Sequence, residues 1–188
     1  MTFLERTKSV LGLAVMLKDD LSPDKKTIGE VFLKATRVKK KILQHSTGYF
    51  LLIDLPEGEH VLTGGGHFYK PGNLTVNTTS INPKQPFAEL TLAPKSNYPF
   101  PPGITVLVGK IAEKDYRPIA NASITVTSMT QTAISEDDGS FFIQFTIASD
   151  IDITLTISKN GYISGSVPVQ LKKGVMTRII EPIMLTRQ

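Results

Sequence analysis

Residues 134–143 read ISEDDGSFFI, and this stretch decides how the second half of the chain folds. Its aspartates and Gly139 suit a tight turn, because Asp bonds to its own backbone and Gly accepts positive φ. After the glycine, Phe141, Ile143 and Phe145 recur at every second position, which is the period of a strand with one buried face. The stretch therefore predicts a hairpin turn that leads into a strand of a β-sandwich.

The same acidic residues raise the alternative of a metal site. A calcium loop of the EF-hand type needs acidic ligands at alternate positions before its glycine and a glutamate well after it. Ser135, Asp137 and Gly139 do alternate, but residues 140–149 contain no acidic residue. The pattern favours the turn over the metal site, and the sequence indicates no cofactor.

Most of the remaining chain consists of short strand-like runs. Examples are GEVFLKA (29–35), YFLLIDL (49–55), ITVLVGKI (104–111), ASITVTS (122–128) and IDITLTIS (151–158). Gly, Pro, Asn and Asp separate these runs, and few stretches show the spacing of an amphipathic helix. The sequence therefore predicts an all-β protein.

An internal repeat divides the chain. Gly48 and Gly139 precede similar aromatic strands and lie 91 residues apart, and Tyr69 and Tyr162 lie 93 residues apart. Landmarks in the same order at a nearly constant offset predict a tandem duplication. We expect a first β-sandwich domain over residues 1–93, a connector over 94–103 and a second domain over 104–188. The connector is rich in proline, which excludes a central strand or a helix interior, and is either a hinge or a rigid spacer.

Several motifs of the second half follow one another in the order found in a known family of domains. They are Gly109-Lys110-Ile111, Arg117-Pro118-Ile119-Ala120-Asn121-Ala122-Ser123-Ile124-Thr125-Val126, Ser135-Glu136-Asp137-Asp138-Gly139-Ser140-Phe141 and Lys159-Asn160-Gly161-Tyr162. Residues 104–186 thereby resemble the carboxypeptidase regulatory-like domain, and the first half matches more loosely through Gly48-Tyr49-Phe50 and Leu55-Pro56-Glu57-Gly58. The resemblance implies two tandem prealbumin-like (Ig-like) antiparallel β-sandwiches.

A second resemblance covers the whole chain. Two such domains, the pair Asp19-Asp20 and the junction Tyr98-Pro99-Phe100-Pro101 are similar to small accessory proteins of phage-tail-like contractile injection particles. This resemblance implies protein partners inside a larger assembly.

Motifs for catalysis are missing. The chain has no cysteine, and its histidines, His45, His60 and His67, lie in neither the HxxE nor the HExxH pattern of zinc proteases. Gly64-Gly65-Gly66 is not followed by a helix pattern, so it predicts a bulge or tight turn and not a phosphate loop. We expect a protein that is not an enzyme.

One basic cluster carries the excess positive charge: Lys34, Arg37, Lys39, Lys40 and Lys41. Without these five, 16 basic residues remain against 17 acidic ones, which does not indicate a general nucleic-acid binder. No aromatic residue interleaves the cluster, so base stacking is not supported. Two interpretations stay open: a solvated, charged strand edge, or a docking site for an acidic partner.

The N-terminal region contains the apolar run VLGLAVML at residues 10–17. It is too short to span a bilayer and no small-residue cleavage site follows it, so we expect a strand and synthesis in the cytoplasm without a signal peptide. The resemblance to accessory proteins of injection particles leaves two final locations open, the cytoplasm or an exported particle.

The sequence favours a non-catalytic structural or adaptor protein. The alternative is a carbohydrate- or peptide-binding module that uses loops at one sandwich end or an exposed strand edge. Its exposed aromatic candidates are Tyr69, Tyr98, Tyr116 and Tyr162; no small-molecule ligand is otherwise indicated.

Overall fold

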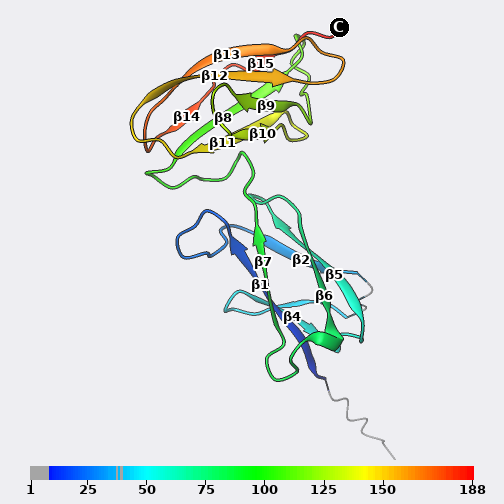
Figure 1. The fold of residues 1–188 in the computed structure, drawn as a ribbon. Helices are drawn as coiled ribbons and strands as arrows, with labels where there is room; N and C mark the ends of the chain where they lie inside the picture. The colour runs from blue at the N-terminus through cyan, green and yellow to red at the C-terminus, as the bar shows by residue number, and fades with distance from the viewer. Residues whose placement is uncertain (1–8, 37, 39) are drawn as a thin grey trace, which may run out of the picture. The chain divides into compact units, whose positions relative to one another are not determined.

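The computed structural model describes residues 9–36, 38 and 40–188. The chain divides into two compact units, Met1–Pro94 and Lys95–Gln188, and each unit is a β-sandwich (Figure 1). Strands joined by turns account for the described chain, with a single 3-10 turn at Thr78–Ser80 and no α-helix among these residues. The prediction of an all-β fold is confirmed.

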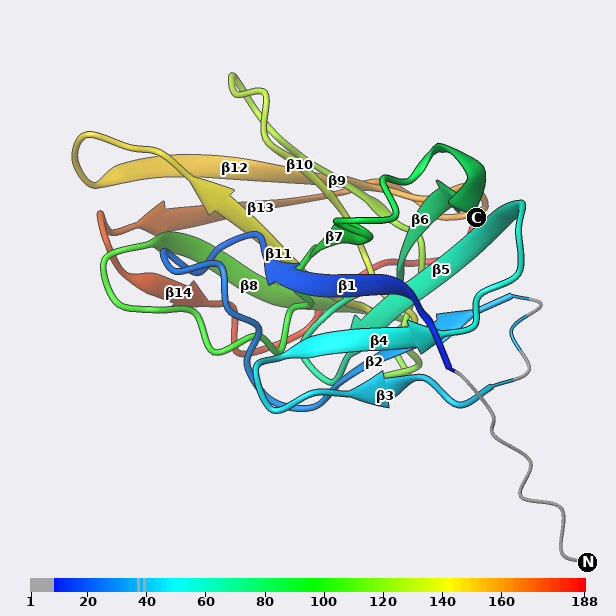
Figure 2. The same cartoon turned by 90° about the horizontal axis from the view of Figure 1, so that it is seen from below.

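The first unit contains two sheets. One has the strand order β3-β4-β1-β7, and the other has the order β2-β5-β6. Figure 2 shows β1, β4 and β3 side by side. The strands are β1 (Leu11–Asp19), β2 (Val31–Ala35), β3 (Leu43–Gln44), β4 (Tyr49–Ile53), β5 (Glu59–Gly66), β6 (Gly72–Asn77) and β7 (Phe87–Leu92).

The second unit repeats this plan. One sheet has the order β11-β8-β14, with β15 also paired to β8, and the other has the order β10-β9-β12-β13. The strands are β8 (Thr105–Ala112), β9 (Ser123–Val126), β10 (Thr132–Ile134), β11 (Ser140–Phe145), β12 (Ile151–Ser158), β13 (Gly165–Leu171), β14 (Met176–Arg178) and β15 (Ile183–Met184).

Strand registers agree between the units residue by residue. Leu13 pairs with Leu52 in the first unit, and Leu107 pairs with Ile143 in the second. In the opposite sheets, the pair β5·β6 and the pair β12·β13 keep the same register, as Leu62 with Leu74 and Leu155 with Val167 show. Corresponding residues lie 91 to 94 positions apart, close to the offsets of 91 and 93 in the internal repeat, so the repeat is visible in the strand pairing.

The sheets are antiparallel except beside the first strand of each unit. There the returning chain pairs in parallel, with Leu17 opposite Leu90 on β7 and Ile111 opposite Ile183 on β15. The short strand β14 also pairs with β8 in parallel.

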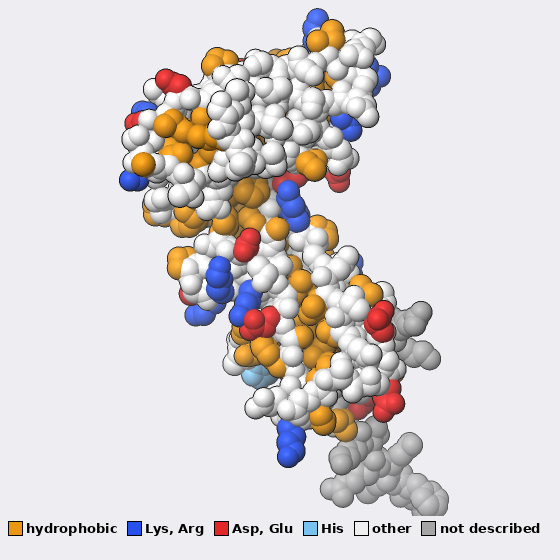
Figure 3. Space-filling model, in the orientation of Figure 1, with side chains coloured by type: hydrophobic (Ala, Val, Ile, Leu, Met, Phe, Trp, Pro, Cys, Tyr) orange, Lys and Arg blue, Asp and Glu red, His pale blue; other side chains and the backbone are white. Residues whose placement is uncertain are grey.

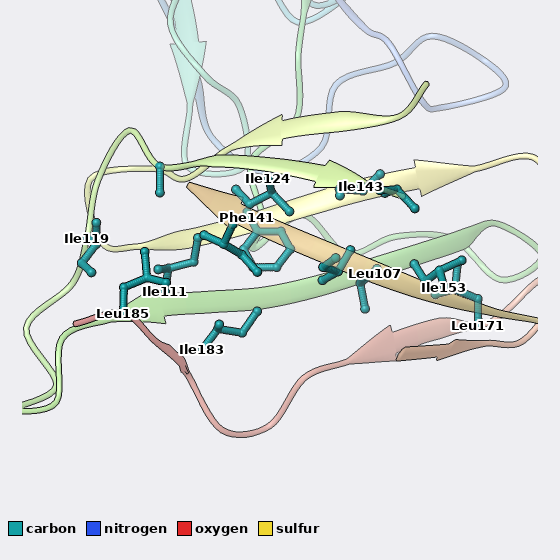
Figure 4. Packing of buried hydrophobic residues seen from close by; sticks show 14 of the residues in the cluster. Leu107, Ile111, Ile119, Ile124, Phe141, Ile143, Ile153, Leu171, Ile183 and Leu185 are labelled. Atoms are coloured by element: carbon teal, nitrogen blue, oxygen red, sulfur yellow. The ribbon is translucent and has the colours of Figure 1, made fainter. Parts of the chain in front are cut away.

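Each unit has its own hydrophobic core between its sheets. In the second unit, Phe141 is fully buried among side chains from both sheets, including Leu107 and Ile124 (Figure 4). Phe141, Ile143 and Phe145 all point into this cluster, as their alternation predicts.

The triple glycine of the first unit departs from the sequence prediction. Gly64, Gly65 and Gly66 form the end of β5 and pair with β2, instead of making a bulge or tight turn. A Cβ on Gly64 would lie 2.8 Å from Leu90 Cδ2 and 2.9 Å from Leu17 Cδ2. The prediction was wrong because Gly64 lets the two sheets pack closely, which local sequence does not reveal.

One strand changes its sheet between the units. After β2, the short strand β3 pairs with β4, whereas its counterpart β10 pairs with β9 in the other sheet. Consequently β9 has a paired strand along each edge, while β2 is an edge strand of its three-stranded sheet.

Candidate functional site

The outer face of the sheet β3-β4-β1-β7 is a candidate binding surface of the first unit. Leu13, Val15 and Leu17 of β1 point into the core and are buried, so Ala14 and Met16 point to the outer face. An outward face of a sheet in contact with water normally carries polar side chains.

Here an apolar row crosses all four strands. Leu43 pairs with Leu51, Leu51 with Ala14, and Ala14 with Phe87. The outermost members are open: Leu43 is 49% exposed and Phe87 is 44% exposed. Tyr49 adds its ring to the edge of Phe87, with centroids 5.8 Å apart. We call Ala14, Met16, Leu43, Tyr49, Leu51 and Phe87 the apolar face.

Figure 3 shows the first unit from one side, with apolar side chains on its surface beside lysine and acidic side chains. One ion pair lies beside the apolar face, where the Lys18 ammonium is 2.5 Å from the Glu89 carboxylate. These two charges neutralise each other, so the face stays largely apolar around them.

The corresponding face of the second unit is closed by the chain itself. Phe142 corresponds to Leu51 in the strand register of the two units. The centroids of the Phe100 and Phe142 rings lie 5.1 Å apart. Val108, which holds the position of Ala14, is 3% exposed although it lies outside the core cluster. The proline-rich segment is fastened there by the Ser96 hydroxyl, 2.7 Å from the Ser140 hydroxyl.

The basic cluster is divided between the two sheets. Lys34 lies on β2, exposed, with its ammonium 5.2 Å from the centroid of the Phe32 ring. Lys40 forms an ion pair with Asp54, which follows β4. Lys41 is exposed just before β3. Arg37 and Lys39 lie outside the described residues.

The ion pair engages Lys40 within the unit. Two hydrogen bonds lower the pKa of Asp54 below its ordinary value. The one from Lys40 has the larger effect, and the one from the Val10 amide has the next largest. Lys41 and Lys84, by contrast, have no acidic partner among the described residues. Lys41 and Lys84 precede β3 and β7, the two outer strands, which run in the same direction, so both lysines lie toward the same end of this sheet.

The acidic stretch of the second unit is a turn, as predicted. Gly139 has φ +75°, and its amide donates to the Glu136 carbonyl at 2.9 Å. Asp138 accepts a hydrogen bond from the Ser140 amide at 3.0 Å and lies 3.2 Å from the Lys110 ammonium. Burial opposes ionisation of Asp138, but the hydrogen bonds from Ser140 and Lys110 outweigh it and lower its pKa.

The histidines have structural contacts. His60 is buried and its Nε2 lies 2.8 Å from the Pro56 carbonyl oxygen, while the Nδ1 of exposed His45 lies 2.7 Å from the Thr47 hydroxyl. Within residues 9–36, 38 and 40–188, no three His, Cys, Asp or Glu side chains gather in an arrangement suited to a metal ion.

A polar cavity lies at one end of the second sandwich. It is partly open to solvent, has a volume of about 480 Å³, and is lined by Asn121, Ser123, Ser158, Lys159, Asn160, Gly161, Tyr162, Ser164 and Gln188. Of the tyrosines named as binding candidates, Tyr162 lines this cavity, Tyr116 is 66% exposed, and Tyr69 and Tyr98 are buried.

The sequence pattern did not single out the apolar face, although one signal was available. The run YFLLI of β4 is apolar at every position, which is typical of a strand covered on both sides. In this unit only the side facing the core is covered by the second sheet, because Phe50 and Leu52 are buried and the alternate residues are half-buried.

Comparison with protein families and with curated proteins finds no match. Among solved structures, an N-terminal interface mutant of the type II Cohesin-X-Dockerin complex from Acetivibrio cellulolyticus shows 19% identity and a TM-score of 0.34, covering 44% of this chain. A C-terminal interface mutant of the same complex gives 20% identity and a TM-score of 0.33. The chain spans 58% of the length of both of these chains.

The Bacillus anthracis TIE protein matches over 95% of this chain and 34% of its own, with 13% identity and a TM-score of 0.37. All three TM-scores are low, so the assignment as a tandem β-sandwich protein rests on the strand pairing. No helix among the described residues is long and apolar enough to cross a membrane.

Proposed function

We propose that this chain is a non-catalytic adaptor, and that the apolar face of its first unit binds a partner protein. The observation that carries the proposal is the apolar row Leu43–Leu51–Ala14–Phe87, whose counterpart in the second unit is covered by Phe100. Exposed apolar patches bordered by polar residues are characteristic of protein–protein interfaces.

The partner surface should be apolar at its centre and acidic at its margin. Burying Leu43, Phe87 and Tyr49 removes apolar area from water, which supplies affinity. Lys41 and Lys84, at one end of this sheet, then favour acidic residues opposite them, and such exposed charges chiefly raise the rate of association. Lys34 lies on the other sheet and is not part of this surface.

The test uses proteins encoded beside this chain as candidate partners in a pairwise binding assay. Leu43→Ser with Phe87→Ser should abolish binding, because both side chains are exposed and their loss leaves the core intact. The matched control is Ile134→Ser on the second unit, where the side chain is 62% exposed. Equal binding by the double variant and the control would refute the proposal.

Charge reversal examines the border separately. Lys41→Glu with Lys84→Glu should slow association about tenfold at low salt and less at physiological salt, where the screening length is about 8 Å. Lys40→Glu is avoided, since it would leave Asp54 beside a second carboxylate. An association rate unchanged at low salt would remove the charges from the proposal while leaving the apolar face untouched.

The resemblances suggest the setting of this adaptor. We propose that the two units are carboxypeptidase regulatory-like sandwiches. After synthesis in the cytoplasm, the protein would act within a larger assembly, a phage-tail-like contractile injection particle. Purified particles should then contain the chain at a fixed ratio to sheath or tube protein by mass spectrometry. Its absence from particles whose other components are complete would exclude this setting.

A carbohydrate-binding module is the second candidate function. The polar cavity beside Tyr162 favours it, because hydroxyl and amide groups from loops converge on a space large enough for a sugar. A glycan array should then detect binding that Tyr162→Ala together with Asn160→Ala removes. If no glycan on the array binds, the carbohydrate-binding candidate is excluded and the adaptor function is the one that remains.

A further inference from the structure

The open edge of β2 is a second binding feature, separate from the apolar face. Its three-stranded sheet has the order β2-β5-β6, so among the described residues β5 is the only strand paired with β2. We propose that this edge binds an extended, acidic segment of a partner protein as an additional antiparallel strand.

Backbone geometry shows which groups are available there. The Thr36 amide donates to the Val61 carbonyl at 3.0 Å, and the His67 amide donates to the Glu30 carbonyl at 3.2 Å. Hydrogen-bonded positions alternate in an antiparallel pair, so the odd-numbered residues of β2 direct their N–H and C=O groups away from β5. These residues are Val31, Leu33 and Ala35, and their backbone groups face the open edge.

The second unit shows how a strand occupies the same position. β10 pairs with β9 in antiparallel register, with Ala133 opposite Ile124, and the Ser135 amide donates to the Ala122 carbonyl at 3.0 Å. By the repeat register, Ile124 corresponds to Leu33 of β2. The fold therefore accepts a strand at this position in the second unit, and in the first unit the chain's own candidate, β3, is paired elsewhere.

Charge indicates what kind of strand fits. Lys34 is exposed on β2 and corresponds to Thr125, which pairs with Thr132 of β10. An incoming strand would therefore place one side chain opposite Lys34, where an acidic residue is favourable and a basic one is not. Pairing between two copies would bring two lysine-rich segments together, which disfavours a second copy as the occupant.

A synthetic peptide with the sequence of residues 129–137 provides the probe, with Thr132→Glu to place a carboxylate opposite Lys34. Added to the full chain, it should slow amide hydrogen exchange at Val31, Leu33 and Ala35 at least tenfold. A Thr132→Lys peptide should bind about two- to fivefold more weakly.

The control peptide carries an N-methyl group on Ala133, which removes a ladder donor without altering its charge. Strand addition requires that this peptide fail to protect the three amides. Equal binding of the N-methylated and unmethylated peptides would overturn the proposal, as would absence of binding. Protection confined to Ser123–Val126, through displacement of β10, would overturn it as well. A concentration-dependent dimer with the same three amides protected would assign the edge to a second copy.

Discussion

The Tyr69 hydroxyl donates a 2.8 Å hydrogen bond to the buried carboxylate of Asp19, 50 residues earlier in the chain. The second unit repeats this relationship, because the Tyr162 hydroxyl donates to Glu113 at 2.6 Å. In both units the carboxylate stands at the end of the first strand and the tyrosine bridges to the C-terminal segment of the unit, at Pro94 and Arg187. A tyrosine thus ties the first and last segments of each sandwich together.

Removing the first of these hydroxyls should be the more costly change. Tyr69→Phe leaves the buried Asp19 and the Ile28 amide without the phenolic oxygen, and we expect a loss of about 1–3 kcal/mol in the free energy of unfolding. Tyr162→Phe should cost less, because Tyr162 and Glu113 are only partly buried whereas Tyr69 and Asp19 are fully buried. Urea denaturation of both variants provides the comparison, and equal losses would contradict it.

The two turn glycines distinguish steric from conformational effects. Gly48 and Gly139 both have positive φ, of +92° and +75°, so alanine should cost about 1–2 kcal/mol at either from backbone strain. A Cβ on Gly139 would also lie 2.3 Å from the Ile111 carbonyl oxygen, whereas Gly48 has open space around it. Gly139→Ala should therefore destabilise clearly more than Gly48→Ala in thermal unfolding. Similar midpoints for the two variants would show that the turn relaxes.

The core of the second unit depends on Phe141. This side chain is fully buried, and Phe141→Ala should lower the free energy of unfolding by about 3–5 kcal/mol through lost burial and a cavity. Ile134→Ala provides the exposed control, with an expected change within about 0.5 kcal/mol. Calorimetry of each variant checks both values, and a small loss for Phe141→Ala would mean that the core collapses around the space.

Acid stability should depend on Glu113. The hydrogen bond from Tyr162, and then that from Arg187, lowers its pKa from the ordinary value. A lowered folded-state pKa contributes stability that is complete above the unfolded value, about 4.3, and is lost as the pH falls through the folded value. The difference in melting temperature between the wild type and Arg187→Gln should therefore be largest near neutral pH and should shrink below about pH 4. A constant difference down to pH 2 would contradict this linkage.

Calcium binding offers a test of the acidic turn. Asp137 is exposed, and Asp137→Asn should change the free energy of unfolding by at most about 1 kcal/mol, as is usual for a surface turn position. Calorimetric titration of the wild type should show no stoichiometric calcium binding. Binding that Asp137→Asn abolishes would restore the metal interpretation.

Local sequence was sufficient for the class of fold and for the repeat. Alternation at Phe141, Ile143 and Phe145 marks a half-buried strand, and Gly139 marks the turn before it, because both signals depend only on neighbouring residues. The constant offset between Gly48 and Gly139 then carries the same architecture into the first half, and the strand registers agree with it.

Pairing between distant strands was decided only by the tertiary structure. Whether β3 joins β4 or β2 depends on competing contacts far apart in the chain, and a short apolar run carries no mark of its partner. That choice leaves the edge of β2 open and adds Leu43 to the apolar face. Likewise, the basic run indicates one cluster, but Asp54 engages Lys40 and the two sheets separate Lys34 from Lys41. Sequence determined which segments are strands, since that depends on local pattern; the tertiary structure determined which surfaces those strands leave uncovered, since that depends on non-local packing.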